Sequence, residues 1–257
     1  MNWLKAILSK TKKYDPISAI VVTIAGYFLS QIGGVAVLII LSIFLGWDSG
    51  QIVDKLSDSP WVSLVFTLSV YGFYIAIIKS FLKWCRTSLE SIGLKMTKDW
   101  YDIPGFALAG YGAYFLFAIM VTALVEKGVT NVDLNQKQEL GFNTYASGFE
   151  LLPIFIALVI IPPVVEEIVT RGFLYTGLRK KFNVLWSGMI TSIIFAAAHL
   201  QWGGDAPLLW AAAIDTFILS WVLIYLREKT GSIYPAIGLH MIKNFMAFLA
   251  LFIFHVA

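Results

Sequence analysis

The C-terminal half of this sequence carries a small set of charged, imidazole and amide side chains within otherwise apolar segments. They are Glu166, Glu167, Arg171, His199, Asp215, His240, Lys243 and Asn244. Residues four apart on an α-helix share a face, so Glu167 and Arg171 are spaced for an ion pair, with the glutamate on the favourable N-terminal side. Glu166 is rotated from Glu167 by about 100° and is left to point elsewhere. A carboxylate removed from water suits a general base; the alternative for this run is a buried ion pair that only fixes helix packing.

The two histidine-containing segments show the same four-residue spacing. Phe195 precedes His199, and His240 precedes Asn244, so the members of each pair share a helix face. A single histidine in an apolar helix is usually a satisfied packing residue. Three segments that each carry a polar residue of a catalytic type are harder to explain by packing alone, so we expect any function to reside in this half of the chain.

The segments that must position these residues are strongly apolar. Of the 257 residues, 58% are hydrophobic and 14% are charged, and the mean hydropathy is +0.77. This composition excludes a disordered chain, a coiled coil and an ordinary soluble domain, and it indicates an integral membrane protein. The net charge of +3 does not argue for nucleic acid, and the single cysteine, Cys85, excludes an intramolecular disulfide framework. A charge near the bilayer centre costs roughly 3 kcal/mol, so the charges within these segments need a reason.

Seven segments reach the length of about 20 largely apolar residues that a membrane helix needs. They are 16–47, about 60–78, 103–125, 148–178, 182–200, 206–226 and 231–254. Pro162 and Pro163 predict a kink in the fourth segment, because each removes a backbone donor. We therefore predict an all-α, polytopic membrane helix bundle of about seven transmembrane helices. Residues 1–147 hold the first three helices with their loops, and residues 148–257 hold the last four, which carry the candidate functional residues.

Basic residues alternate between the loops. They gather in the N-terminal tail and after the second, fourth and sixth segments, namely Lys5, Lys10, Lys12, Lys13, Lys79, Lys83, Arg86, Lys95, Lys98, Arg179, Lys180, Lys181, Arg227 and Lys229. The other loops hold only Lys55, Lys127 and Lys137. Because cytoplasmic loops carry the excess of Lys and Arg, we expect a cytoplasmic N-terminus and an external C-terminus. The compact chain with short loops indicates a bacterial plasma membrane.

Three motifs in order, Glu166-Glu167-x-x-x-Arg171-Gly172, Phe195-x-x-x-His199 and His240-x-x-x-Asn244, resemble those of the CPBP intramembrane proteases. That family, also called the ABI family, groups the type II CAAX prenyl endopeptidases with bacterial proteins linked to bacteriocin processing and self-immunity. The resemblance covers about residues 150–250. The run 227–236 also resembles the linker that usually precedes the third motif. Thr170 departs from the pattern, because many relatives carry an aromatic residue there.

The resemblance implies peptide-bond hydrolysis inside the membrane without a cofactor. It implies that Glu166 with His199 activates a water, that His240 and Asn244 stabilise the oxyanion, and that Glu167 and Arg171 support the site. Amide hydrolysis requires a base for water and donors aimed at the developing negative charge, and these residue types supply both. The expected partners are membrane lipid and a membrane-associated peptide or protein substrate. A prenylated C-terminal motif is the second choice of substrate, because bacteria generally lack protein prenylation.

A metal-dependent version uses the same residues. Glu166, His199 and His240 form a two-histidine, one-carboxylate set that could bind zinc and leave a fourth position for water. The sequence has no His-Glu-x-x-His helix. Spacing does not separate the two schemes, and we favour the glutamate-activated water.

Two further charges, Asp215 and Lys243, match no motif position. Lys243 lies three residues after His240, and neither charge has another evident partner. We predict that they form an intramembrane ion pair beside the site, with Phe195 also nearby. The alternative is that Lys243 extends toward the membrane surface while Asp215 faces a water-filled cavity.

Two other classes of function compete with the protease. A membrane scaffold or bacteriocin-immunity protein would bind a partner through the same polar cavity without catalysis. A small transporter or proton relay would also place glutamate and histidine in the membrane, but it would commonly show internal repeats, and none is visible.

Overall fold

The computed structural model describes residues 14–97, 99–128, 136, 142, 148–201 and 208–255, and these form a bundle of helices without any strand. Six helical segments within them are apolar and long enough to cross a membrane. They are α2 (Pro16–Leu45), α4 (Pro60–Trp84), α5 (Ile103–Gly128) with the turn η2 (Trp100–Asp102), the composite helix Gly148–Arg179, α10 (Trp210–Thr230), and α11 (Tyr234–Phe248) with η6 (Leu249–Ile253). The predicted all-helical membrane bundle is confirmed, and the chain is an integral membrane protein.

The fifth predicted span is shorter than expected. Its helix, α9, covers only Val184–Ala197, which is 14 residues. At 1.5 Å per residue this is about 21 Å, less than the hydrocarbon thickness of about 30 Å. The helix begins at Asn183, whose side chain accepts the Trp186 N–H, and it gives way to a turn before His199. The second motif therefore ends in a turn and not on a regular helix.

The composite helix from Gly148 to Arg179 is continuous but irregular. Its parts are η3 (Gly148–Glu150), α6 (Leu151–Phe155), the π-helical turn η4 (Ile156–Ile160), α7 (Ile161–Glu167), the π-helical turn η5 (Ile168–Leu174) and α8 (Tyr175–Arg179). Pro162 and Pro163 follow η4 after one residue, Ile161, whose N–H bonds to the Ile156 carbonyl. The predicted disruption takes the form of this π turn, a common way to accommodate a break in the hydrogen-bond ladder.

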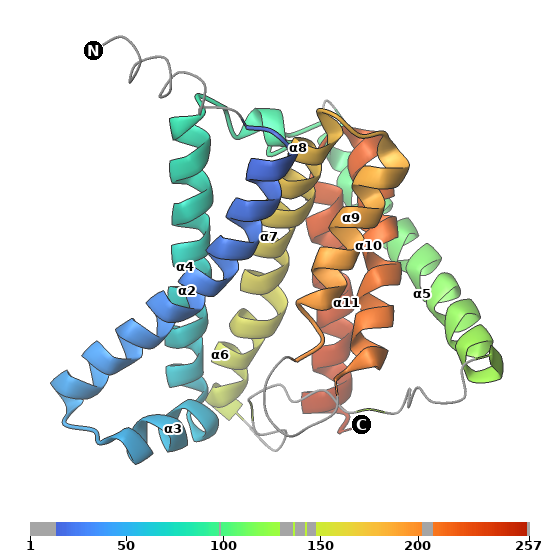
Figure 1. Ribbon diagram of the computed structural model, residues 1–257. Coiled ribbons are helices and arrows are strands. Elements are labelled where there is room, and N and C mark those ends of the chain that lie inside the picture. The colour runs from blue at the N-terminus through green and yellow to red at the C-terminus, as the bar shows by residue number, and fades with distance from the viewer. Residues whose placement is uncertain are drawn as a thin grey trace, which may run out of the picture.

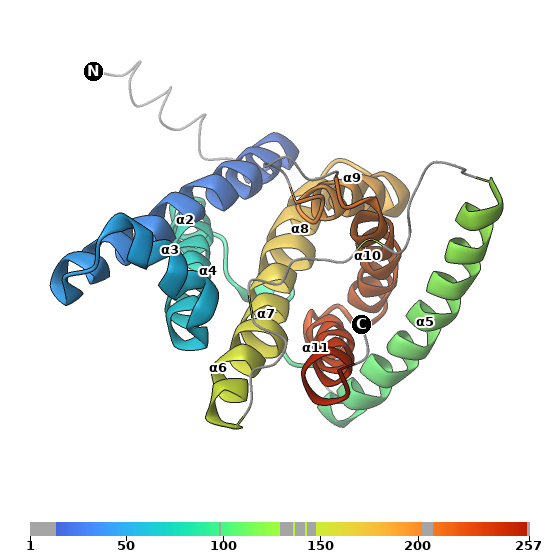
Figure 2. The same ribbon diagram turned by 90° about the horizontal axis from the view of Figure 1, so that it is seen from below.

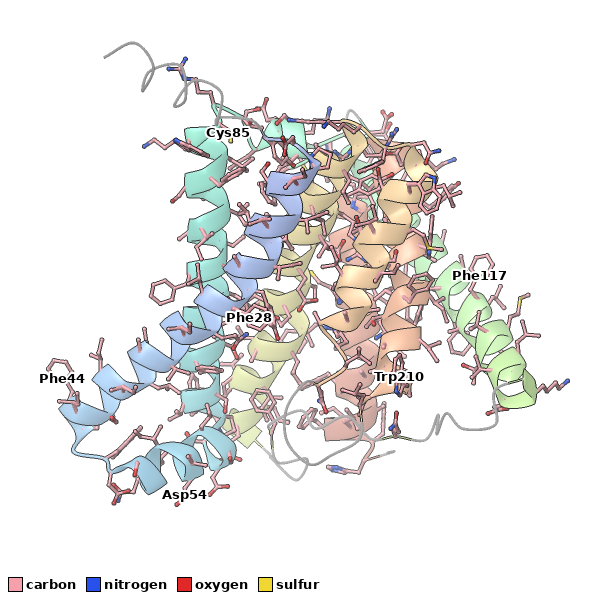
Figure 3. All side chains as sticks on the ribbon, in the orientation of Figure 1. Phe28, Phe44, Asp54, Cys85, Phe117 and Trp210 are labelled. Atoms are coloured by element: carbon pink, nitrogen blue, oxygen red, sulfur yellow. The ribbon has the colours of Figure 1, made fainter. Side chains whose placement is uncertain are left out.

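The composite helix runs through the middle of the bundle (Figures 1 and 2). The pair α2 and α4 packs on one side of it, whereas α9, α10 and α11 lie on the other, with α5 at the far edge. Buried residues of α5 fall only in its N-terminal half, at Ala107, Gly110 and Tyr114, and its C-terminal end leans away from the bundle. Exposed aromatic side chains such as Phe44 on α2 and Phe117 on α5 lie at opposite edges (Figure 3), as expected of surfaces that face lipid.

Small residues let α2 and α4 approach closely. A methyl group built on Gly34 would lie 2.4 Å from Cγ2 of Val70, and one on Gly26 would lie 2.9 Å from the Tyr74 ring. Close backbone approach at glycine is a general feature of helix pairs in membranes, where lipid gives helices no hydrophobic reason to associate. These contacts place the Tyr74 side of α4 against α2.

The chain between these helices contains short elements that the sequence did not reveal. Helix α3 (Ser49–Asp58) follows α2 and begins at Asp48, whose side chain and that of Gln51 form a capping box. The polar stretch 87–101 holds the 3-10 turn η1 (Glu90–Ile92) and part of η2. Ile92 of this stretch is fully buried.

The basic loops lie together at one end of the bundle. Lys180 Nζ donates to the Tyr14 carbonyl at 2.7 Å, and Arg179 pairs with Glu228 at 3.1 Å. Cys85 lies at this end and Asp54 of α3 at the other (Figure 3), so the alternation of charge matches the arrangement of helices. Which end faces the cytoplasm stays a prediction. Among the basic residues used to predict orientation, Lys5, Lys10, Lys12, Lys13, Lys98 and Lys137 lie outside the described residues.

The first span begins at a well-formed cap. Asp15 Oδ1 accepts the Ser18 N–H at 2.9 Å, and the Ser18 hydroxyl accepts the Asp15 N–H at 2.9 Å. The bond from the Ser18 backbone holds the pKa of the Asp15 carboxyl below its ordinary value. Pro16 occupies the first helical position, where no N–H is required.

Candidate active site

A buried ion pair forms the base of the site. Arg171 Nη1 lies 2.8 Å from Glu167 Oε1, and both side chains are 0% exposed. The same nitrogen donates to Thr170 Oγ1 at 2.9 Å, and the guanidinium lies 4.3 Å from the centre of the Phe195 ring. The pair predicted from the four-residue spacing is present, and its burial makes each partner dependent on the other.

Glu166 points into the bundle and away from the Glu167–Arg171 pair. Its Oε1 accepts a hydrogen bond from the Tyr71 hydroxyl of α4 at 2.7 Å, and its Oε2 lies 3.9 Å from Nε2 of His240. The Glu166 side chain is 19% exposed, compared with 0% for Glu167. The two neighbouring glutamates thus divide as expected, one paired in the core and one partly exposed and directed elsewhere.

His240 of α11 is held between the two carboxylates. Its Nδ1 lies 3.0 Å from Glu167 Oε1, the same oxygen that binds Arg171. Because an ionised carboxylate only accepts hydrogen bonds, we assign the hydrogen of this contact to Nδ1. This leaves Nε2 of His240 facing Glu166.

His199 is oriented by the turn that ends α9. Its backbone N–H bonds to the Ala196 carbonyl at 3.0 Å, which frees the Phe195 carbonyl from its usual helical partner. The His199 Nδ1 forms a hydrogen bond with the Phe195 carbonyl at 2.8 Å. Since a carbonyl only accepts, Nδ1 carries the hydrogen and the neutral ring presents a lone pair on Nε2.

The Phe195 ring brings the three motifs together. Its centre lies 4.7 Å from that of His199 and 6.0 Å from that of His240, with Arg171 against the same ring. His199 also lies within electrostatic range of Glu166 and His240. The expectation that Phe195 lies beside the catalytic candidates agrees with these contacts.

Asn244 makes a contact that the sequence did not predict. Its Nδ2 donates to the main-chain carbonyl of Leu158 at 2.9 Å. That carbonyl would accept from residue 162 in an α-helix or from residue 163 in a π-helix, and both are prolines without an N–H. The asparagine of the third motif therefore satisfies a carbonyl that Pro162 and Pro163 leave without a helical partner. The Asn244 amide has a second N–H, which this bond does not use.

The two charges outside the motifs form the predicted pair. Lys243 Nζ lies 2.8 Å from Asp215 Oδ2, and the Tyr114 hydroxyl of α5 donates to the other oxygen, Asp215 Oδ1. Lys243 and Asp215 are 24% and 33% exposed, so the pair is only partly shielded. It joins α10, α11 and α5 beside the residues of the third motif.

The alternative zinc set receives no support from the geometry. Within the described ranges, no group of three or more His, Cys, Asp or Glu side chains is placed to hold a metal ion. The bonds that Glu167 and the Phe195 carbonyl make to Nδ1 of His240 and His199 leave the Nε2 atoms as the ones that would bind a metal. Metal dependence is therefore a matter for the chelator experiment described below.

An apolar cavity adjoins the segment that carries the second motif. It has a volume of about 860 Å³ and lies between α5, α9 and α10. Its lining includes Phe117 and Trp210, labelled in Figure 3, and also Ala197 and Leu200, which lie within two residues of His199 in the chain. A membrane-facing apolar space of this size beside the site suits the apolar part of a membrane-associated ligand.

The fold and composition define a polytopic helical membrane protein with a buried glutamate–histidine cluster. Residues 148–246 match the family model described as type II CAAX prenyl endopeptidase Rce1-like. The matched residues contain all three motifs but make up less than half of the chain. This segment is therefore similar to the CAAX protease-like family, and the similarity supports a membrane protease. Comparison with curated proteins and comparison with solved structures each found no match.

Proposed function

We propose that this protein is an intramembrane endopeptidase that hydrolyses a peptide bond of a membrane-associated peptide or protein. The observation that carries the proposal is the position of Glu166. Its carboxylate faces the interior of the bundle with Oε2 3.9 Å from Nε2 of His240, in a segment that matches a CAAX protease family. If the Glu166 carboxylate faced lipid, far from the rings of His199 and His240, it would not be able to act as the base.

In the proposed reaction Glu166 is the base. A water molecule forms a hydrogen bond to the Nε2 lone pair of His199 and transfers its other proton to Glu166 as its oxygen attacks the scissile carbonyl carbon. The proton taken by Glu166 then passes to the leaving nitrogen as the C–N bond breaks. The products are a carboxylic acid and an amine, and no external oxidant or reductant is required.

The negative charge on the tetrahedral intermediate needs donors. Asn244 offers the N–H that is not bonded to Leu158, so one side chain both fixes its own orientation and faces the substrate. His240 donates from Nε2 in its imidazolium form, because its Nδ1 hydrogen is directed at Glu167. The buried Glu167–Arg171 pair acts through this histidine as a positioning element.

The experiment compares purified wild type with Glu166→Gln in proteoliposomes, using a library of fluorogenic peptides with apolar segments. We expect Glu166→Gln to lower turnover by at least about 100-fold, because positioned acid–base groups contribute factors of this size. Asp54→Asn makes the same chemical change at an exposed site on α3 and should leave turnover unchanged. Retained turnover in Glu166→Gln would refute the assigned base.

A chelator tests the role of metal in the same assay. The proposed chemistry predicts full turnover after dialysis against 1,10-phenanthroline, whereas a zinc enzyme would lose activity and regain it on adding zinc. If the wild type cleaves nothing across the library, the non-catalytic scaffold or immunity function becomes the better explanation. The location in a bacterial plasma membrane and a cytoplasmic N-terminus remain part of the proposal.

A further inference from the structure

The Glu166 carboxylate has a partner from outside the family-matched segment. Tyr71 lies on α4, whereas the match covers residues 148–246. Its hydroxyl donates to Glu166 Oε1 at 2.7 Å across 95 positions of sequence. Because an ionised carboxylate only accepts, the direction of this bond is set by chemistry.

This bond restricts how Glu166 can rotate. With Oε1 held by Tyr71, the other oxygen is directed at Nε2 of His240, 3.9 Å away. A hydrogen bond to an ionised group is stronger and more directional than one between neutral groups. Through Tyr71, helix α4 of the N-terminal half therefore contributes directly to the surroundings of Glu166.

We propose that Tyr71 is a positioning residue that orients the Glu166 carboxylate toward the substrate water, so that the site is completed by the N-terminal helices. The inference rests on the proposed protease function. It goes beyond the three motifs, all of which lie on the composite helix, α11 and the segment formed by α9 and its following turn. Such a site depends on the packing of α4 against α7, because this packing brings Tyr71 within hydrogen-bond distance of Glu166.

The chain offers a matched control on the same helix. Tyr74 lies three residues after Tyr71 and donates its hydroxyl to the Thr23 carbonyl of α2 at 2.7 Å. Tyr71→Phe and Tyr74→Phe each remove one hydroxyl and one such bond from α4. Only the first removes a bond to Glu166.

We expect Tyr71→Phe to lower kcat by about 10-fold with KM unchanged, since orienting an acid–base group accounts for part of its effect of roughly 10²–10⁴. Tyr74→Phe should leave kcat within about twofold of wild type. A folded Tyr71→Phe protein with unchanged kcat, or an equal loss in both variants, would overturn the proposal. A loss carried by KM alone would also overturn it.

Infrared difference spectroscopy separates this inference from the protease function. The band lost in Glu166→Gln identifies the Glu166 carboxylate stretch. Tyr71→Phe should shift that band and Tyr74→Phe should not, whether or not any peptide is cleaved. An unshifted band rejects the bond between Tyr71 and Glu166 even if the enzyme is active, whereas absent turnover with a shifted band rejects the protease function and the catalytic positioning role together.

Discussion

The buried pair of Glu167 and Arg171 gives the sharpest prediction for stability. Both side chains are 0% exposed, and their closest atoms are 2.8 Å apart. Removing one partner of a buried pair costs about 3–5 kcal/mol, because the other charge is left without compensation. In Arg171→Met, Glu167 keeps its contact with His240 Nδ1 at 3.0 Å. We therefore expect this substitution to lower the free energy of unfolding by about 3 kcal/mol, the lower end of that range.

The assay is thermal unfolding in detergent micelles, followed by tryptophan fluorescence. A loss of about 3 kcal/mol corresponds to a fall in Tm of about 6–12 °C for a chain of this size. Arg179→Met is the matched control, because Arg179 pairs with Glu228 at 3.1 Å on the same composite helix but with side chains 34% and 36% exposed. An exposed pair contributes less than about 1 kcal/mol, so this control should move Tm by only a few degrees.

A double variant tests the cause of the loss. In Glu167→Gln/Arg171→Met no buried charge remains unpaired, so it should be less destabilised than the sum of the single variants by about 2 kcal/mol or more. Additive losses would show that the two side chains do not interact as the geometry indicates. Equal losses for Arg171→Met and Arg179→Met would refute the argument from burial.

Two further outcomes follow from contacts outside the motifs. A double-mutant cycle of Asp215→Asn and Lys243→Met should show a coupling of about 1 kcal/mol in thermal unfolding, because the pair is only partly shielded; no coupling would reject the pair. Gly34→Ala should destabilise the protein by about 1–3 kcal/mol, because the added methyl would lie 2.4 Å from Val70 Cγ2. Gly72→Ala, which meets nothing within 4 Å, should be neutral or stabilising in the same measurement, and equal losses in both would contradict the close packing of α2 on α4.

The local relations within a helix were predictable from the sequence. The pair of Glu167 and Arg171 follows from four-residue spacing, and so does the different direction of Glu166. The number and approximate position of the apolar segments follow from composition, although α9 proved shorter than its apolar run. That difference arises because His199 ends the helix in a turn and bonds the Phe195 carbonyl with its own ring.

The relations between helices were decided only by the tertiary structure. Glu166, His199 and His240 lie on separate segments, and the Phe195 ring and the two carboxylates bring them together. Tyr71 gave no signal in the sequence, because it lies in a helix that is apolar on every face.

The physical reason is the same in each case. Helical periodicity fixes which residues share a face, and the cost of charge in lipid fixes which segments carry function. Lipid is as apolar as the core, so the pattern of hydrophobic residues does not say which face of a helix meets its neighbour. Close contacts at residues such as Gly26 and Gly34, and prolines that free a carbonyl for Asn244, set those rotations in three dimensions.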